Sequence, residues 1–241
     1  MARADRPGLT VRVWWAGPTD AVDATVLDDV ERDRAAGFRY DADRGRFVVG
    51  AVLARHVLGR HLAVAPAEVP VDRSCATCGR PHGPVRSPGS RLRLSVSHAG
   101  TAVVVAAALD TSVGIDVEPV AGLADARPLA RDHLAPTERA VLAGLDDRAF
   151  THRFAELWVA KEAVLKATGD GLRLPMAGLE LAGPGPSYRL RAWGERPDLV
   201  GRVSLRPLRG APPGHVASLA VLDGPATFVV EELSAAGFLD A

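Results

Sequence analysis

Helical segments followed by strand-like segments occur in both halves of this 241-residue chain, although no sequence repeat is visible. The first half reads as strand, helix, helix, strand and strand, in the order 9–15, 21–36, 43–62, 92–96 and 101–109. The second half reads as one strand, three helices and several short strands, at 113–117, 123–134, 136–144, 148–168 and 179–233. This order predicts an α+β fold with a seam near Asp110. We therefore expect an N-terminal subdomain at 1–110 and a C-terminal subdomain at 111–241.

The overall charge of the chain excludes some classes of partner. Acidic and basic residues number 29 each, so no net charge draws the chain to nucleic acid or to an anionic membrane. We expect neither as a partner, and we expect any phosphate recognition to be local. The N-terminus lacks the apolar region of a signal peptide, and no stretch approaches the ~20 apolar residues of a membrane span. A cytoplasmic location is the expectation.

Two carboxylates mark the strand-like sequence Gly-Ile-Asp-Val-Glu at 114–118. Asp116 and Glu118 are two residues apart and point to one face of a strand, while Ile115 and Val117 point to the other face and can be buried. Two carboxylates on one face repel each other unless a cation joins them. Mg²⁺ suits such a pair, because it also accepts waters and substrate phosphates. A solvated strand edge or an acidic turn before the next proline is the alternative.

Lysine is confined to one helical segment. Only two of the 29 basic residues are lysines, Lys161 and Lys166. An ammonium is a compact charge that reaches a single oxygen or takes part in proton transfer, whereas a guanidinium is a planar, permanently charged fork. Lys161 interrupts an otherwise core-facing stripe, and Glu162 and Lys166 are neighbours four residues apart. The alternatives are coincidence and a surface salt bridge that contributes little.

Two further motifs lie in loops. Ser97 and His98 join two strand-like runs, and their hydroxyl and imidazole can donate to phosphate oxygens. A plain turn and a Ser-His nucleophile pair are the alternatives, but neither a glycine elbow nor an orienting acid accompanies Ser97. Cys75 and Cys78, the only cysteines, precede His82 in a Cys-x-x-Cys sequence. This is either half of a zinc site that still needs His82 and a fourth ligand, or a surface loop with two reduced thiols.

In their order and spacing, these motifs resemble the Sfp-type 4'-phosphopantetheinyl transferases. The resemblance rests on Gly-Ile-Asp-Val-Glu at 114–118, on Trp-Val-Ala-Lys-Glu-Ala at 158–163 with Lys166, and on the upstream Ser-His pair. Further likeness upstream, including Cys75 to Gly83, extends the match over roughly 31–174. It implies a pseudo-dimer of two similar α+β subdomains, with coenzyme A in the cleft between them. The first would contact the nucleotide end, and the second would carry the metal-binding carboxylates and meet the carrier protein.

The resemblance also implies roles for single residues. The family's metal ligands correspond to Asp116, Glu118 and Glu162. The residues that match contacts to coenzyme A are Arg34, Arg46, Ser97, His98, Lys161 and Lys166. Glu162 and Lys166 would in addition be catalytic.

The chain departs from the family's pattern at two places on the nucleotide side. Glu31 stands where a second basic residue beside Arg34 often binds the 3'-phosphate, and Arg32 is a candidate replacement. In the loop after His82, the adenine-side contact could come from Arg80 or from Arg86.

The implied reaction is attack by a carrier-protein serine hydroxyl on the β-phosphate of coenzyme A, which releases adenosine 3',5'-bisphosphate. Mg²⁺ would neutralise the pyrophosphate, and Glu162, directly or through a metal-bound water, is the candidate general base. The expected enzyme is of the holo-[acyl-carrier-protein] synthase type, a monomer that acts on acyl or peptidyl carrier proteins, with secondary metabolism among the pathways. The alternatives are a metal-dependent phosphoesterase, which would use water as nucleophile, and a non-catalytic binding module that holds zinc.

Overall fold

The computed structural model describes residues 8–75, 77–81, 83–123, 125–225 and 227–239. Its strands are β1 (Thr10–Ala16), β2 (Leu92–Ala99), β3 (Ala102–Leu109), β4 (Val113–Pro119), β5 (Leu179–Ala182), β6 (Arg189–Trp193), β7 (Val203–Pro207), β8 (His215–Leu222) and β9 (Val229–Ser234). Its α-helices are α1 (Asp29–Ala36), α2 (Asp41–Leu62), α3 (Ala126–His133), α4 (Pro136–Leu142), α5 (Asp147–Thr168) and α6 (Ala236–Leu239). None of these helices is both long and apolar enough to cross a bilayer.

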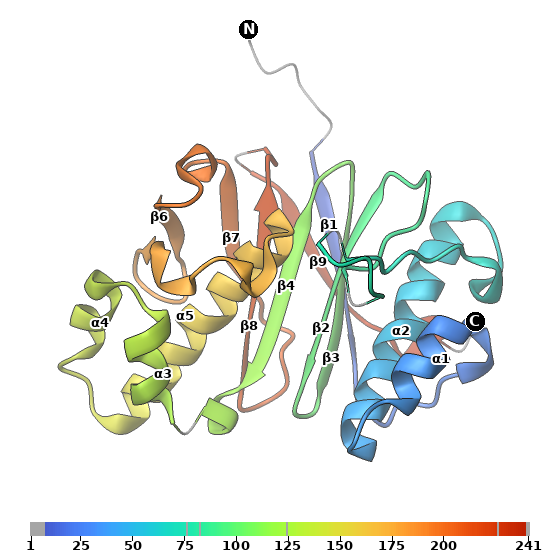
Figure 1. Cartoon of the computed structure of the whole chain (residues 1–241), viewed down its shortest axis with the longest axis horizontal. Helices are drawn as coiled ribbons and strands as arrows, with labels where there is room; N and C mark the ends of the chain where they lie inside the picture. Colours follow the sequence, from blue (N-terminus) through green and yellow to red (C-terminus); the bar gives the residue numbers. More distant parts are fainter. Residues whose placement is uncertain (1–7, 76, 82, 124, 226, 240–241) are drawn as a thin grey trace, which may run out of the picture.

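The two halves of the chain repeat one topology. In the first half the strand order is β2-β3-β1, and in the second half it is β7-β8-β4. In both, the first strand pairs antiparallel with the last, which also pairs antiparallel with the strand before it. A long helix, α2 or α5, packs on each sheet (Figure 1). The predicted α+β fold of two similar subdomains is therefore confirmed.

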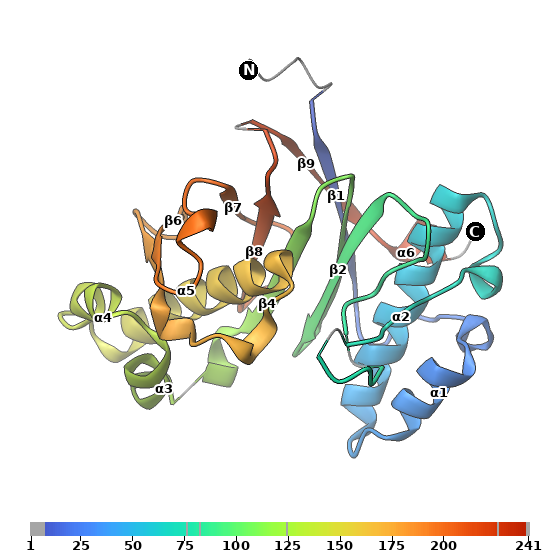
Figure 2. The ribbon, with the colours of Figure 1, turned by 45° about the horizontal axis from the view of Figure 1, so that its top comes forward.

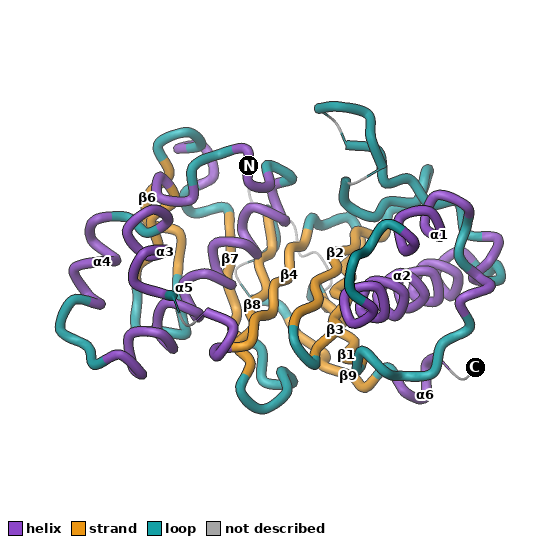
Figure 3. The backbone as a smooth tube through the Cα atoms, turned by 60° about the horizontal axis from the view of Figure 1, so that its bottom comes forward, coloured by secondary structure: helices purple, strands orange, loops and turns teal. Residues whose placement is uncertain are grey.

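The layers follow from the alternation of side chains along the buried strands. On β3, Val103 and Val105 face α2, while Val104 and Ala106 face the second sheet. On β4, Ile115 belongs to the same inter-sheet core. The two sheets thus pack face to face between α2 and α5, as Figure 3 shows. Because both faces of β3 are covered, the strand is an almost continuous run of valine and alanine.

Strands β2 and β4 meet at the seam between the halves (Figure 2). The backbone amide of Ile115 donates to the Ser95 hydroxyl oxygen across 3.0 Å. On the other face of β4, a Cβ added to Gly114 would lie 2.0 Å from the Ala163 carbonyl oxygen of α5. Glycine is thus required at 114, because it lets β4 approach the helix closely enough to set Asp116 and Glu118 opposite α5.

Two features of the chain ends depart from the simple order. The helix predicted at 21–36 begins only at Asp29, because Asp28 accepts a hydrogen bond from the Glu31 amide and caps it. Near the C-terminus, β9 pairs parallel with β1, so this segment of the second half belongs to the sheet of the first half. The division into subdomains at 1–110 and 111–241 stays a prediction.

A buried ion pair ties the helices of the second half together. Lys161, which is 0% exposed, lies 2.6 Å from Glu138 of α4 and donates to the carbonyl oxygens of His133 and Met176. Glu138 in turn accepts hydrogen bonds from the amides of Ala135 and Leu181. Burial lowers the pKa of Lys161, and the nearby Glu138 opposes this shift. The pair is therefore satisfied on both sides, and removal of either partner would leave a buried charge.

We predict that Lys161→Ala lowers the free energy of unfolding by about 3–5 kcal/mol, because Glu138 then stays buried without its cation. Arg131→Ala, which removes an exposed ion pair with Asp132, is the control and costs less than about 1 kcal/mol. Urea unfolding followed by circular dichroism measures both. A Lys161→Ala loss as small as that of the control would contradict the structural role of the pair.

Candidate functional site

A pocket of about 550 Å³ lies between the two halves and contains most of the predicted site residues. The N-terminal half contributes Arg34, Phe47, Ala51, Arg73, Gly83, Pro84, Val85, Leu94, Ser95, Val96, Ser97 and His98. The C-terminal half contributes Asp116, Glu118, Trp158, Glu162, Leu165, Lys166, Gly169 and Gly171. The pocket wall therefore combines β2 and the end of α1 on one side with β4 and α5 on the other.

Asp116, only 4% exposed, is the centre of a network that joins three elements. Its Oδ1 accepts a hydrogen bond from the Ser97 hydroxyl of β2 at 2.7 Å and an ion-paired one from Lys166 Nζ of α5 at 2.7 Å. Lys166 Nζ also lies 3.1 Å from Ser97 Oγ and 3.1 Å from the Ile115 carbonyl oxygen. From the sequence, Lys166 was expected to neighbour Glu162, four residues before it on the helix. In the structure, Lys166 forms its ion pair with Asp116 of β4 instead.

The other two carboxyl groups of the pocket, Glu118 and Glu162, have raised pKa values. Burial raises the pKa of Glu118 to about 7, and the negative charges of Asp116 and Glu162 add to this effect while Lys166 opposes it. Burial, followed by the charge of Asp116, also raises the pKa of Glu162. Both carboxyl groups are therefore costly to ionise, first because they are buried and then because Asp116 lies nearby.

This donor set fits a magnesium ion. Asp116 Oδ2 is buried and has no hydrogen-bond partner, and the carboxyl groups of Glu118 and Glu162 face the same pocket. Within the described ranges, no three His, Cys, Asp or Glu side chains converge so as to enclose an ion by themselves. Mg²⁺ does not need such a cage, because it takes one or two carboxylates and completes its shell with waters and phosphates.

The predicted phosphate contacts lie beside the carboxylates. His98 lines the pocket, and burial lowers the pKa of its imidazole, as do the charges of Lys166, Arg46 and Arg34. A neutral imidazole keeps one N–H that can donate to an anion. Arg46 is an ion-pair partner of Asp43 and donates to the Gly100 carbonyl oxygen at 3.0 Å. Arg46 is not among the residues that line the pocket.

Two arginines of the N-terminal half line the pocket. The guanidinium groups of Arg34 and Arg73 lie 5.0 and 5.7 Å from the centre of the Phe47 ring. Burial and then the charge of Arg73 lower the pKa of Arg34, while Glu31 raises it. Arg34 donates to the Pro81 carbonyl oxygen at 3.4 Å. Two cations on one ring create a positive site that suits a phosphate.

Glu31 explains why sequence analysis missed Arg73. The Glu31 carboxylate is buried between Arg55 and Arg73, and it accepts hydrogen bonds from Arg73 at 3.0 and 3.2 Å. An acidic residue at 31 therefore fixes a cation that comes from 42 residues further along the chain. Arg32, the expected replacement, instead bonds to Asp29 and the Leu27 carbonyl oxygen and does not line the pocket. A local sequence motif cannot predict the pair of Glu31 and Arg73, because the two residues are 42 positions apart.

One predicted contact lies away from the pocket. Lys161 was expected to touch coenzyme A, but its ammonium is buried in the core against Glu138. Its side chain leaves α5 on the face toward α3 and α4 and is not among the residues that line the pocket. Neither Arg80 nor Arg86 lines the pocket in the described part of the chain. The zinc interpretation depends on His82, which lies outside the described residues.

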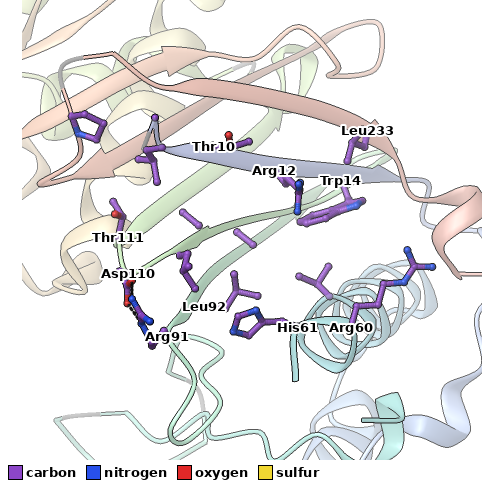
Figure 4. A pocket seen from close by; sticks show the side chains of 17 residues that line it. Thr10, Arg12, Trp14, Arg60, His61, Arg91, Leu92, Asp110, Thr111 and Leu233 are labelled. Carbon is purple, nitrogen blue, oxygen red and sulfur yellow. Dashed lines mark hydrogen bonds and ion pairs between the residues drawn. The ribbon is translucent and has the colours of Figure 1, made fainter. Parts of the chain in front are cut away.

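A larger hollow, of about 1230 Å³, lies at the end of the first sheet beside the C-terminal end of α2 (Figure 4). Its charged groups include Arg91, which is paired with Asp110, and Arg12, which is paired with Glu231. None of the predicted site residues lines it. The inter-half pocket is the better candidate, because it combines uncompensated carboxylates with cations suited to phosphate.

Two family models match the chain. A model described as "4'-phosphopantetheinyl transferase, N-terminal" matches residues 14–110. A second, described as "4'-phosphopantetheinyl transferase superfamily", matches residues 112–202. Together they cover well over half of the sequence.

Curated relatives and solved structures carry related descriptions. The 4'-phosphopantetheinyl transferase HetI of Nostoc sp. is 34% identical over 62% of this chain and 62% of its own. A phosphopantetheinyl transferase of Thraustochytrium sp. is 31% identical over 69% of this chain and 63% of its own. The match thus spans less than two thirds of the length of either relative. The crystal structure of holo-ACP-synthase from Plasmodium yoelii covers 47% of this chain and 94% of its own, with 18% identity and a TM-score of 0.40.

The raised pKa of Glu118 predicts a pH-dependent stability of the metal-free protein. Its carboxyl group has a pKa of about 7 in the folded chain against an ordinary value of 4.5, so stability is lost as the pH rises through this interval. In the presence of a chelator, Glu118→Gln should raise the melting temperature by a few degrees at pH 8 and by less at pH 5. Differential scanning calorimetry measures this, with the exposed Glu195→Gln as control. An equal gain in melting temperature at both pH values would contradict the conclusion that the ionised Glu118 carboxylate destabilises the metal-free fold.

Proposed function

Because this chain belongs to the 4'-phosphopantetheinyl transferase superfamily, we propose that it transfers the 4'-phosphopantetheine group of coenzyme A to a serine of a carrier protein. The observation that carries the proposal is the pocket between the halves, where Asp116, Glu118 and Glu162 face Ser97 and Lys166. A pocket lined by carboxylates from the C-terminal half and by two arginines from the N-terminal half suits a ligand that carries both a pyrophosphate and a separate phosphate.

Asp116, Glu118 and Glu162 are the residues that would hold Mg²⁺. The ion, when bound, supplies charge neutralisation at the pyrophosphate and at the transferred phosphoryl group. The unpartnered Oδ2 of Asp116 and the raised pKa values of Glu118 and Glu162 support this assignment, because a cation relieves the repulsion among all three.

Glu162 is the proposed general base. A carboxyl group whose pKa is raised by burial holds a proton more readily near neutral pH, which suits it to accept the proton of the attacking serine hydroxyl. As the serine oxygen bonds to the β-phosphorus, the bond to the bridging oxygen breaks and adenosine 3',5'-bisphosphate leaves.

The Ser97 hydroxyl donates to Asp116, and Lys166 donates to Asp116, Ser97 and the Ile115 carbonyl oxygen. When the pyrophosphate binds, Lys166 and Ser97 would each exchange one of these bonds for a bond to a phosphate oxygen, Lys166 at the departing phosphate, and the His98 N–H would also donate to the pyrophosphate.

The two halves would divide the substrates between them. The N-terminal half would hold the nucleotide end of coenzyme A through Arg34 and Arg73, which line the pocket. Arg46 would add a contact only if it left Asp43 and the Gly100 carbonyl oxygen. The C-terminal half supplies the carboxylates and meets the acyl or peptidyl carrier protein, as in a holo-[acyl-carrier-protein] synthase. A monomer suffices for this arrangement, because both walls of the pocket come from one chain.

Carrier loading tests the proposal. Incubation with coenzyme A, Mg²⁺ and a panel of apo-carrier proteins should add one phosphopantetheine to a serine, detected by mass spectrometry of the intact carrier. Glu162→Gln should lower the rate of transfer at least about 100-fold, which is the lower limit of the effect expected for loss of a general base. Its circular dichroism spectrum should match that of the parent chain. A chelator should also stop the parent enzyme. Cleavage of coenzyme A without any carrier would favour a metal-dependent phosphoesterase instead.

Arg73 is predicted to bind coenzyme A through the phosphate that is not part of the pyrophosphate. Arg73→Gln should raise the KM for coenzyme A about tenfold or more, since a charge-assisted hydrogen bond contributes about 1.5–3 kcal/mol, and should leave kcat nearly unchanged. With 3'-dephospho-coenzyme A as donor, parent and variant should have similar KM values. The exposed Arg148→Gln is the control. An equal loss with both donors would contradict the assignment.

A further inference from the structure

In the Cys-x-x-Cys sequence, Thr77 and Cys78 lie in a turn. A bridge between Asp72 and Arg86 joins the chain on either side of this sequence. The Gly79 amide donates to the Cys75 carbonyl oxygen at 2.8 Å, and the Cys75 amide donates to the Arg80 carbonyl oxygen at 2.9 Å. Cys75 is partly buried and Cys78 is exposed, and the two do not form a disulfide in the structure. The proposed transfer reaction uses neither thiol.

The turn directs hydrogen-bond donors at both sulfur atoms. The Cys75 sulfur accepts from the backbone amides of Thr77 and Cys78, which lowers the pKa of its thiol. The Cys78 sulfur accepts from the Arg80 side chain and amide and from the Cys75 thiol, and its pKa is lowered as well. Since the thiolate is the reactive form of cysteine, this surrounding favours nucleophilic attack, and exposure makes Cys78 the sulfur that attacks first.

We propose that Cys75 and Cys78 form a reversible dithiol–disulfide pair that reacts with low-molecular-weight disulfides. The Cys78 thiolate attacks one sulfur of the small disulfide, forms a mixed disulfide and releases one thiolate. Cys75 then loses its proton and attacks the Cys78 sulfur, which forms the Cys75–Cys78 bond and releases the second thiolate. The two electrons lost by the cysteines reduce the small disulfide, and the two protons end on the released thiols.

The position of the turn connects it to the pocket. Thr77, between the two cysteines, accepts a hydrogen bond from Arg173 of the C-terminal half at 2.8 Å. Arg173 also donates to the carbonyl oxygen of Gly169, which lines the pocket. In the same loop, the Gly83 amide donates to the Arg73 carbonyl oxygen at 2.7 Å, and both residues line the pocket. A disulfide that reshapes the turn should therefore weaken coenzyme A binding, a consequence that, unlike the disulfide itself, rests on the proposed function.

Intact-mass spectrometry and thiol counting after treatment with oxidised glutathione test the disulfide. The parent chain should lose two hydrogen atoms and both titratable thiols, and dithiothreitol should restore them. Cys75→Ala should instead retain one glutathione on Cys78, because nothing resolves the mixed disulfide, and Cys78→Ala should react more slowly. A parent chain that does not react, that keeps glutathione attached, or that reacts only after a chelator removes bound metal would overturn the proposal.

The link to the pocket is tested separately by calorimetric titration of coenzyme A. The dissociation constant should rise at least severalfold in the disulfide form and return after reduction. The Cys75→Ala, Cys78→Ala double variant has no other cysteine, so the oxidant should leave its affinity unchanged. Equal affinities of the dithiol and disulfide forms would overturn the link while leaving the disulfide in place. Absence of binding by the reduced parent would instead count against the proposed function.

Discussion

Asp116 accepts hydrogen bonds from Ser97 and Lys166 at the place where β2, β4 and α5 meet. A buried carboxylate is costly unless it is paired, so these two bonds fix the relative position of the halves at the pocket. The close approach of α5 to Gly114 allows Lys166 to reach across. The remaining oxygen of Asp116 is buried without a hydrogen-bond partner, and we propose that it binds a cation together with Glu118 and Glu162.

The two halves of the chain contribute opposite charges to the pocket wall. From the C-terminal half, Glu118 and Glu162 have raised pKa values, first because they are buried and then because of the neighbouring carboxylates. From the N-terminal half, Arg34 and Arg73 share the Phe47 ring, and the buried Glu31 holds Arg73 in place. A polyanionic ligand that arrives with a divalent cation balances both sets of charges at once. This complementarity, more than any single residue, supports the proposed substrate.

Most of the fold could be predicted because helix and strand periods are strong local signals. The spacing of Asp116 and Glu118 placed both on one face of a strand, and both line the pocket. Lys161 and Arg73 could not be placed, since each depends on a partner that is distant in sequence, Glu138 and Glu31. The sequence marks Lys161 as unusual, but only the packing of α4 on α5 decides that it is a core residue.

A crystal structure of the chain with coenzyme A and Mg²⁺ tests the central claim most directly. We predict that the pyrophosphate lies against Ser97 and Lys166, with the ion bound to Asp116 and at least one of the two glutamates. The separate phosphate should lie beside Arg34 and Arg73. Coenzyme A in the larger hollow at the end of the first sheet, or an inter-half pocket that stays empty at saturating ligand, would contradict the assignment.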